Sequence, residues 1–328
     1  MKKQRIVYFG SPEFSLPPLK TLYLGGYEIV GIYTQEPKKK FRGQKKYNTP
    51  VQQWAESQLL PVFTPKILDD TSLKEFQTLK PDVAILFAYG KIVPLNWLNT
   101  PLNGFINIHA SLLPRWRGAA PVQRAIENND KETGITIIKM NDKIDEGPIL
   151  VQQNIEINDL TDGKQLIDQI SHDSCSLLYN TLKKYFLGQI QLKEQDHSQS
   201  TYAKKIDKFE TQVDWGLSAS IIEKKVRAFY PSPAMWFKYK GQRFKILKAK
   251  ISNLQDEKGK IINLPLTIAC KNDSLDILEI QAQGKKPLSI KEFILGNNQF
   301  QRHYGPNSHT TPTWLLSRAK VRGIYIYI

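Results

Sequence analysis

Short apolar runs alternate with amphipathic stretches along the first half of the chain. The apolar runs predict buried strands, and the stretches with apolar residues at helical spacing predict helices between them. Strands that alternate with helices form a mostly parallel sheet with helices on its faces. The pattern therefore predicts an α/β, Rossmann-like amino-terminal domain. Its strands are expected at 6–9, 28–33, 82–87 and 105–108, and its helices at 16–24, 50–60 and 72–79.

Further along the chain the pattern changes. Strands at 134–140 and 149–157 and a long helix at 166–187 are expected to complete the first domain, and a polar, weakly patterned stretch follows. A short helix at 218–229 then precedes several short strand-like runs, which predict a smaller antiparallel β-barrel of the oligonucleotide-binding (OB-like) type. We place the boundaries at 1–189 for the first domain, 190–207 for a linker, 208–305 for the barrel and 306–328 for a tail of unknown role.

Composition is that of a globular protein. Hydrophobic residues make up 41% and charged residues 23% of the 328 residues, and no apolar run approaches the ~20 residues that span a bilayer. Cys175 and Cys270 are far apart and lack a ligand pattern, so we expect reduced thiols in a cytoplasmic protein with no membrane association.

The net charge of +15 is unevenly distributed. Residues 201–328 hold 22 Lys and Arg against 10 Asp and Glu, whereas residues 1–200 hold 24 against 21. A basic second half attached to a nearly neutral first half favours a polyanionic partner such as a nucleic acid. Charge alone leaves open a generic basic surface that only promotes solubility.

Two polar residues lie at the end of an expected strand. Asn107 and His109 are two positions apart, so their side chains point to the same face, and ligands of open α/β sheets sit beyond the carboxyl ends of the strands. An amide and an imidazole there could stabilise an oxyanion and move a proton. Taken alone, so short a pattern favours the plainer reading, in which Asn107 caps a turn and His109 is a buried histidine with its hydrogen bonds satisfied, because short motifs match by chance.

A longer stretch of sequence is more specific. The run His109–Pro121, together with Asp145-Glu146-Gly147-Pro148, resembles the folate-dependent formyltransferase family. The stretches 10–14, 88–94 and 226–233 fit the same family, and the resemblance covers about residues 5–300.

The resemblance implies catalytic roles for Asn107, His109 and Asp145. The reaction it implies is attack of an amine on the formyl carbon of 10-formyltetrahydrofolate, which places negative charge on the formyl oxygen. Asn107 is then expected to donate to that oxygen. His109, oriented by Asp145, is expected to share the charge and to pass a proton toward the folate nitrogen. Without the resemblance, Asp145 is better explained as a helix N-cap or turn former than as a catalytic group.

The resemblance also implies where the folate lies. The pterin is expected in an apolar slot, which suits a flat heteroaromatic ligand, although core packing also accounts for the two leucines. The remaining histidines show no metal-ligand spacing, so no metal is expected. The residues assigned to folate are Ser111, Leu112, Leu113, Pro114, Phe87 and Tyr89.

Within the family, initiator methionyl-tRNA is the expected acceptor, and a monomer is the expected state. Three features favour tRNA as the acceptor: the sequence of residues 115–121, the basic second domain and a cationic loop at 38–46. A lysine-rich loop is otherwise a solvated surface run. Here Phe41 and Gln44 replace the more usual glycine and lysine. The tRNA contacts are expected from Lys40, Arg42, Lys45 and Lys46.

Two other functions fit the same sequence less well. A formyltransferase acting on a small amine, such as glycinamide ribonucleotide or an amino-sugar nucleotide, would share Asn107, His109 and Asp145 but would not need the basic features. An RNA-binding protein with an inactive formyltransferase domain would not need those three residues intact.

Overall fold

The computed structural model describes residues 3–40, 45–263 and 265–296. The chain divides into two compact units. The first unit contains Met1–Val122, Lys131–Ile157 and Gln165–Lys204. The second contains Gln123–Asp130, Asn158–Lys164 and the chain from Lys205 onward.

A seven-stranded sheet forms the centre of the first unit as far as the structure describes it. The strands are β1 (Arg5–Gly10), β2 (Glu28–Tyr33), β5 (Val62–Phe63), β6 (Val83–Phe87), β7 (Phe105–His109), β9 (Glu132–Lys139) and β10 (Ile149–Glu156). Their order is β10-β9-β7-β6-β1-β2-β5. Strands β7, β6, β1, β2 and β5 run parallel, β9 runs antiparallel to β7, and β10 antiparallel to β9. The carboxyl ends of β1, β6 and β7 therefore meet at one edge of the sheet.

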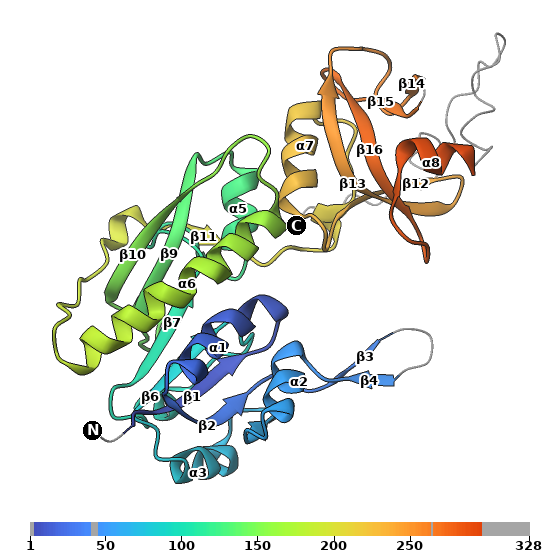
Figure 1. Cartoon of the computed structure of the whole chain (residues 1–328). Helices are drawn as coiled ribbons and strands as arrows, with labels where there is room; N and C mark the ends of the chain where they lie inside the picture. The colour runs from blue at the N-terminus through green and yellow to red at the C-terminus, as the bar shows by residue number, and fades with distance from the viewer. Residues whose placement is uncertain (1–2, 41–44, 264, 297–328) are drawn as a thin grey trace, which may run out of the picture. The chain divides into compact units, whose positions relative to one another are not determined.

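Helices cover both faces of this sheet (Figure 1). Successive residues of β1 point to opposite faces: the Tyr8 hydroxyl donates to the Ser15 carbonyl on one side, and Phe9 packs against Phe76 on the other. The helices are α1 (Leu16–Leu24), α2 (Pro50–Ser57), α3 (Asp70–Thr78), α4 (Leu95–Leu98) and α6 (Gly163–Phe186). Helix α6 lies beside α1, because the Ser171 hydroxyl donates to the carbonyl of Phe14, just before that helix.

Local sequence signals set the helix ends. Thr49 caps α2 by accepting from the Gln52 N–H at 3.1 Å, with Pro50 in the first turn. Asp69 and Ser72 form a reciprocal capping box at the start of α3. Helix α2 is shorter than the predicted 50–60, since Leu59 has a φ of 56°, in the left-handed region where a helix cannot continue.

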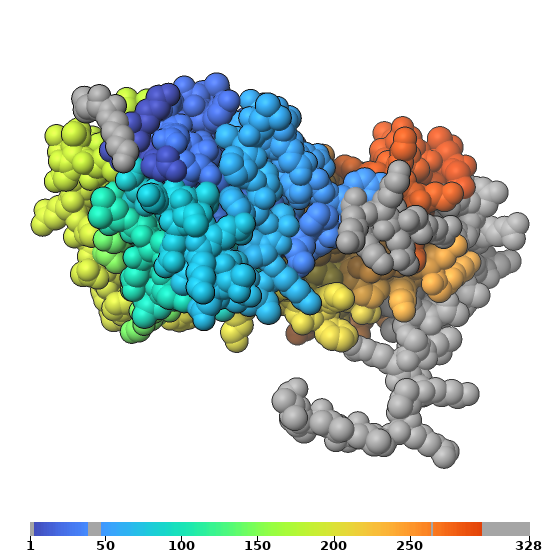
Figure 2. Space-filling view, turned by 90° about the horizontal axis from the view of Figure 1, so that it is seen from below, coloured from blue at the N-terminus to red at the C-terminus, as the bar shows by residue number. Residues whose placement is uncertain are grey.

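An aromatic cluster fills one side of the first unit. Phe9 stacks on Tyr33 with ring centroids 4.7 Å apart, and Phe76 stacks on Trp97 at 4.8 Å. All four side chains have zero exposure. In the space-filling view, the blue and cyan residues of the first third of the chain make a continuous surface over this unit (Figure 2). Aromatic rings of this size supply a large share of the apolar burial that stabilises the sheet.

The predicted cationic loop contains a hairpin. Strands β3 (Lys38–Lys40) and β4 (Lys45–Tyr47) pair antiparallel, with Lys39 opposite Lys46 and Lys40 opposite Lys45. The hairpin extends away from the body of its unit, beyond α2 (Figure 1). The connecting residues 41–44 lie outside the described residues.

As far as the structure describes it, the second unit combines an antiparallel sheet with three α-helices. The order of its main strands is β12-β13-β16-β15-β14, and β17 pairs with β16. Residues Phe237 and Phe244 pack as a cross-strand pair in its core, 5.7 Å apart. The elements are α5 (Pro121–Glu127), α7 (Ala219–Ala228), β12 (Met235–Tyr239), β13 (Gln242–Ser252), β14 (Ile261–Asn263), β15 (Thr267–Ala269), β16 (Ser274–Ala282), β17 (Leu288–Ser289) and α8 (Ile290–Leu295).

The fold class predicted from the sequence is confirmed. The first unit has a Rossmann-like, mostly parallel sheet, and the carboxyl-terminal part has an antiparallel sheet. The predicted tail at 306–328 lies outside the described residues. In the described ranges, every helix is too short or too polar to cross a membrane.

Candidate active site

Strand β7 places Asn107 and His109 side by side at the carboxyl edge of the sheet. The two residues are only 6% and 5% exposed. Asn107 lies between Leu86 of β6 and Ile138 of β9 in the ladder, so the backbone that carries it is fixed on both sides. Two polar side chains held by central strands have little freedom, which suits groups that must meet a reacting atom in a defined geometry.

The carboxylate of Asp145 joins these two side chains. It lies in the loop between β9 and β10. Its Oδ1 accepts from Asn107 Nδ2 at 3.2 Å, and its Oδ2 lies 3.5 Å from His109 Nδ1. Oδ2 also accepts the Gly118 N–H at 2.8 Å. The structure thus brings together the three residues that the sequence assigned to catalysis.

The second ring nitrogen of His109 also has a partner. Its Nε2 lies 2.8 Å from the carbonyl oxygen of Trp116. A carbonyl can only accept, so Nε2 carries the hydrogen of this bond. The Asp145 carboxylate faces Nδ1, so each ring nitrogen of His109 faces an oxygen atom that can accept a hydrogen bond.

The loop that approaches Asp145 requires a glycine. Gly118 has a φ of 107°, and a Cβ there would lie 2.9 Å from the carbonyl oxygen of Ala203. Any other residue would have a strained backbone conformation, and its Cβ would force the segment of Gly118 away from that of Ala203. Strand β8 (Arg117–Gly118) pairs with β11 (Tyr202–Ala203) at this point, and the pairing delivers the Gly118 N–H to the carboxylate.

The residues predicted to bind folate lie next to the three polar groups, mostly with buried side chains. Ser111 and Tyr89 have zero exposure, and Phe87 and Leu113 are 2% and 3% exposed. Tyr89 packs edge-on against Phe9 at 5.2 Å, and burial raises the pKa of its phenol above the usual range. Leu112 packs on β9 at Gly134, and Pro114 is half-buried.

Hydrogen bonds from β9 and β10 hold the backbone of this stretch. Thr136 Oγ1 accepts from the Leu113 N–H at 3.0 Å and donates to the Ser111 carbonyl at 2.6 Å. Gln152 Nε2 donates to the Leu113 carbonyl at 2.8 Å. Side chains of two strands therefore fix the path of the chain next to His109.

The predicted tRNA contacts lie at the hairpin. Lys40 ends β3, and Lys45 and Lys46 begin β4. Arg42, the residue singled out in the sequence, lies outside the described residues. The structure therefore groups three of the four residues on one hairpin, apart from Asn107, His109 and Asp145.

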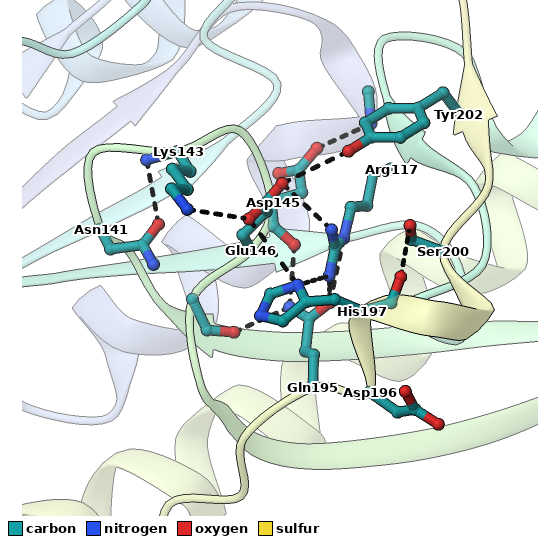
Figure 3. Close-up of polar contacts among 12 residues, drawn as sticks. Arg117, Asn141, Lys143, Asp145, Glu146, Gln195, Asp196, His197, Ser200 and Tyr202 are labelled. Atoms are coloured by element: carbon teal, nitrogen blue, oxygen red, sulfur yellow. Dashed lines mark hydrogen bonds and ion pairs between the residues drawn. The ribbon is translucent and has the colours of Figure 1, made fainter.

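A second polar cluster, which the sequence analysis missed, surrounds the loop of Asp145 (Figure 3). Arg117, 1% exposed, lies 3.1 Å from Glu146 and donates to Gln195 Oε1 at 2.8 Å. His197 Nδ1 lies 2.9 Å from Arg117 Nη2, and the Tyr202 hydroxyl donates to Glu146 at 3.3 Å. Arg117 and Glu146 lie within the two motif stretches, but Gln195, His197 and Tyr202 come from the polar stretch read as a linker. No periodicity or motif marks them in the sequence. Within the described residues, no group of His, Cys, Asp and Glu could hold a metal ion.

Two family models cover most of the chain. The model described as "Formyl transferase" matches residues 4–182, and the model "Formyl transferase, C-terminal domain" matches residues 205–298. The first match contains the strand end of Asn107 and His109 and the loop of Asp145.

Comparison with known proteins gives the same family. The methionyl-tRNA formyltransferase of Pelagibacter ubique is 43% identical over 90% of this chain and 96% of its own length. That of Alkaliphilus oremlandii is 38% identical over 89% and 96%. Among solved structures, HypX from Aquifex aeolicus in complex with tetrahydrofolic acid has a TM-score of 0.62 at 14% identity, over 89% of this chain and 47% of that one. An N-formyltransferase from Helicobacter canadensis has a TM-score of 0.63 at 16% identity, over 84% and 99%; both likenesses show the fold alone. From the geometry, the family models and these relatives together, the chain belongs to the formyltransferase family.

Proposed function

We propose that the chain transfers the formyl group of 10-formyltetrahydrofolate to the α-amino group of methionine on initiator methionyl-tRNA, giving N-formylmethionyl-tRNA for translation initiation. The observation that carries this proposal is the bridge that Asp145 forms between Asn107 and His109. The near full-length likeness to methionyl-tRNA formyltransferases supports the choice of acceptor.

The three polar side chains divide the chemistry among them. One hydrogen of Asn107 Nδ2 is directed at Asp145, and the second can donate to the formyl oxygen as negative charge develops there. His109, held by Asp145 on Nδ1, exchanges the Trp116 carbonyl on Nε2 for the formyl oxygen and then for the folate nitrogen. It passes the Nε2 proton to that nitrogen as the bond from the nitrogen to the formyl carbon breaks, and it takes back the proton that the attacking amine loses. Asp145 keeps the ring oriented and compensates its positive charge.

The residues near the strand ends fit a flat heteroaromatic ligand. The side chains of Phe87, Tyr89 and Leu113 are buried in the core. We propose that they support the apolar side of the folate site from within the core, while the backbone of 111–114 supplies polar contacts. When bound, 10-formyltetrahydrofolate supplies the carbonyl carbon that the amine attacks.

Charge supports the assignment of tRNA as the acceptor. The stretch 38–46 contains five lysines and one arginine. A polyanion such as tRNA neutralises this concentration of positive charge, so the hairpin suits tRNA phosphates better than an uncharged ligand. The positive balance of residues 201–328 supplies a second basic region.

Three further assignments complete the proposal. A monomer is sufficient, because Asn107, His109, Asp145 and Gly118 N–H all come from one chain. A cytoplasmic location fits Cys270, a free thiol whose burial raises its pKa to about 12 and keeps it protonated. Residues 1–189 are proposed as the catalytic domain, 190–207 as the linker and 208–305 as the tRNA-binding domain.

An acceptor comparison tests the function. The chain is incubated with 10-formyltetrahydrofolate and methionyl-tRNA, glycinamide ribonucleotide or an amino-sugar nucleotide, and the formylated products are quantified. N-formylmethionine on tRNA as the dominant product supports the proposal. Preferential formylation of a small amine overturns it, and absence of formylation with all three acceptors would indicate an RNA-binding protein without this activity.

A further inference from the structure

The segment between α6 and the second unit contacts both partners of His109. Gln195 is 5% exposed, and its Nε2 donates to the carbonyl oxygens of Asp145 at 2.8 Å and Gly147 at 2.7 Å. Thr201 Oγ1 accepts the N–H of Trp116 at 2.9 Å. Asp145 faces Nδ1 of His109 and Trp116 faces Nε2, so one short segment holds the two residues that determine the hydrogen bonds of the imidazole.

The side-chain amide of Gln195 makes all the hydrogen bonds that it can make. Its two hydrogens bind the two carbonyls of the Asp145 loop, while Oε1 accepts from Arg117 Nε at 3.1 Å and Nη2 at 2.8 Å. An amide has two hydrogens and two lone pairs, so the side chain has a single satisfactory orientation. Figure 3 shows Gln195 next to Arg117 and the Asp145–Glu146 turn.

The two supported residues have unfavourable backbone conformations. Asp145 has a φ of 54° and Trp116 a φ of 60°. Non-glycine residues in this left-handed region are strained and persist only where the surrounding contacts hold them there. The N–H of Arg117 also donates to the Thr201 carbonyl at 2.9 Å, so the Trp116 turn is held at two consecutive residues.

We propose that Gln195 and Thr201 are positioning residues of the reaction, which act by holding Asp145 and Trp116 against the imidazole of His109. This inference rests on the proposed function, because it gives the linker a role in the same site. In this proposal Gln195 and Thr201 do not contact the reacting atoms. They determine which groups lie next to the two ring nitrogens of His109.

Isosteric substitutions test the inference. Gln195→Glu keeps the shape but places a carboxylate oxygen against two carbonyls, and Thr201→Val removes the acceptor for Trp116. Each is expected to lower kcat about 10- to 100-fold, the scale of a small misplacement of catalytic groups, with both KM values within about twofold of wild type because no substrate contact is removed. Gln191→Glu, the same change at an exposed position, and Thr201→Ser, which keeps the hydroxyl, are the controls.

A spectroscopic readout separates positioning from a loss of folded protein. The ¹⁵N chemical shifts of the His109 ring report the hydrogen bonds of each nitrogen and need no substrate; His109→Ala identifies the signal. The inference is supported if the ¹⁵N chemical shifts of the His109 ring change in both test variants and stay the same in both controls. Wild-type ring shifts, or a kcat loss that only matches the loss of folded protein, overturn it. Inactivity of the wild type on methionyl-tRNA would refute the proposed function instead, and the ring shifts would still decide the inference.

Discussion

The buried cluster of Asn107, His109 and Asp145 and the β3–β4 hairpin belong to the same unit but depend on different physics. In this cluster, side chains that are at most 14% exposed meet at single, defined distances. In the hairpin, lysines are repeated along two short strands. Geometry limits the first region and total charge limits the second, so one substitution should abolish the function of the cluster, whereas the hairpin should lose its function in increments.

The largest effect is expected for His109→Ala. Removal of the imidazole takes away proton transfer and one interaction with the developing charge, so kcat should fall by about 10²–10⁴. Steady-state kinetics with methionyl-tRNA and 10-formyltetrahydrofolate measures it. His172→Ala, at an exposed position on α6, is the control. A loss below tenfold would mean that geometry does not limit the cluster.

Arg117→Met tests whether the ion pair between Arg117 and Glu146 is shielded from solvent. Removal of Arg117 takes away the 3.1 Å partner of Glu146 and leaves that carboxylate with Lys143 at 3.9 Å and His197 at 3.7 Å. The loss of unfolding free energy should therefore be at most the roughly 3–5 kcal/mol that is typical when a buried ion pair loses one partner. Urea unfolding at low and high salt should give the same loss, because a buried pair is poorly screened. Lys248→Met removes a pair whose lysine is 55% exposed and should cost less than about 1 kcal/mol.

A strong salt dependence of the Arg117→Met loss would contradict burial of the pair. Arg117→Met combined with Glu146→Gln should recover part of the stability, since the side chain that has lost Arg117 is then neutral.

The hairpin should respond through salt rather than through kcat. Replacing Lys45 and Lys46 by Gln should raise the KM for tRNA several-fold and lower the slope of log affinity against log salt by about 1 for each phosphate that the variant no longer neutralises. Folate affinity should stay the same. Lys74→Gln with Lys184→Gln removes the same charge from exposed positions elsewhere in the unit. Equal slopes in both double variants would mean that only net charge matters.

The smallest effect is expected at Asp196, which follows Gln195 but is exposed. Hydrogen bonds, above all from the Ser198 hydroxyl, lower its pKa below the ordinary value of 3.8. A lowered pKa contributes stability above pH 3.8 that is lost as the pH falls through the folded-state value. Asp196→Asn should therefore lower Tm slightly at pH 7, and the difference should vanish in acid, with kcat unchanged. A large kcat loss would extend the positioning role to this residue.

Sequence patterns predicted the elements that depend on local periodicity. The apolar runs of β1, β2 and β7 and the spacing in α6 were sufficient to predict the sheet and its covering helix. Asn107 and His109 were found because strand periodicity places them on one face at the end of β7. Asp145 could be assigned only through the family resemblance, because it lies 38 residues away in a loop.

The supports of the site have no such signal. Gln195 and Thr201 lie in a polar stretch without periodicity, and their partners are carbonyl and N–H groups that any sequence provides. Arg117 is likewise a surface residue by type, and only the arrangement of Glu146 and Gln195 around it explains its burial. Hydrogen bonds from a side chain to distant backbone leave no pattern of residue types along the chain.

The pairing of β11 with β8 has a consequence for protein engineering. Chimeras between relatives are normally joined where few contacts are crossed, and a junction at residue 189 would look suitable from sequence. Such a junction would take Gln195, Thr201 and Ala203 from one parent and the Asp145 and Trp116 turns from the other. A crossover placed after Lys204, where the first unit ends, takes the Asp145 and Trp116 turns from the same parent as Gln195 and Thr201, so the hydrogen bonds between them are preserved.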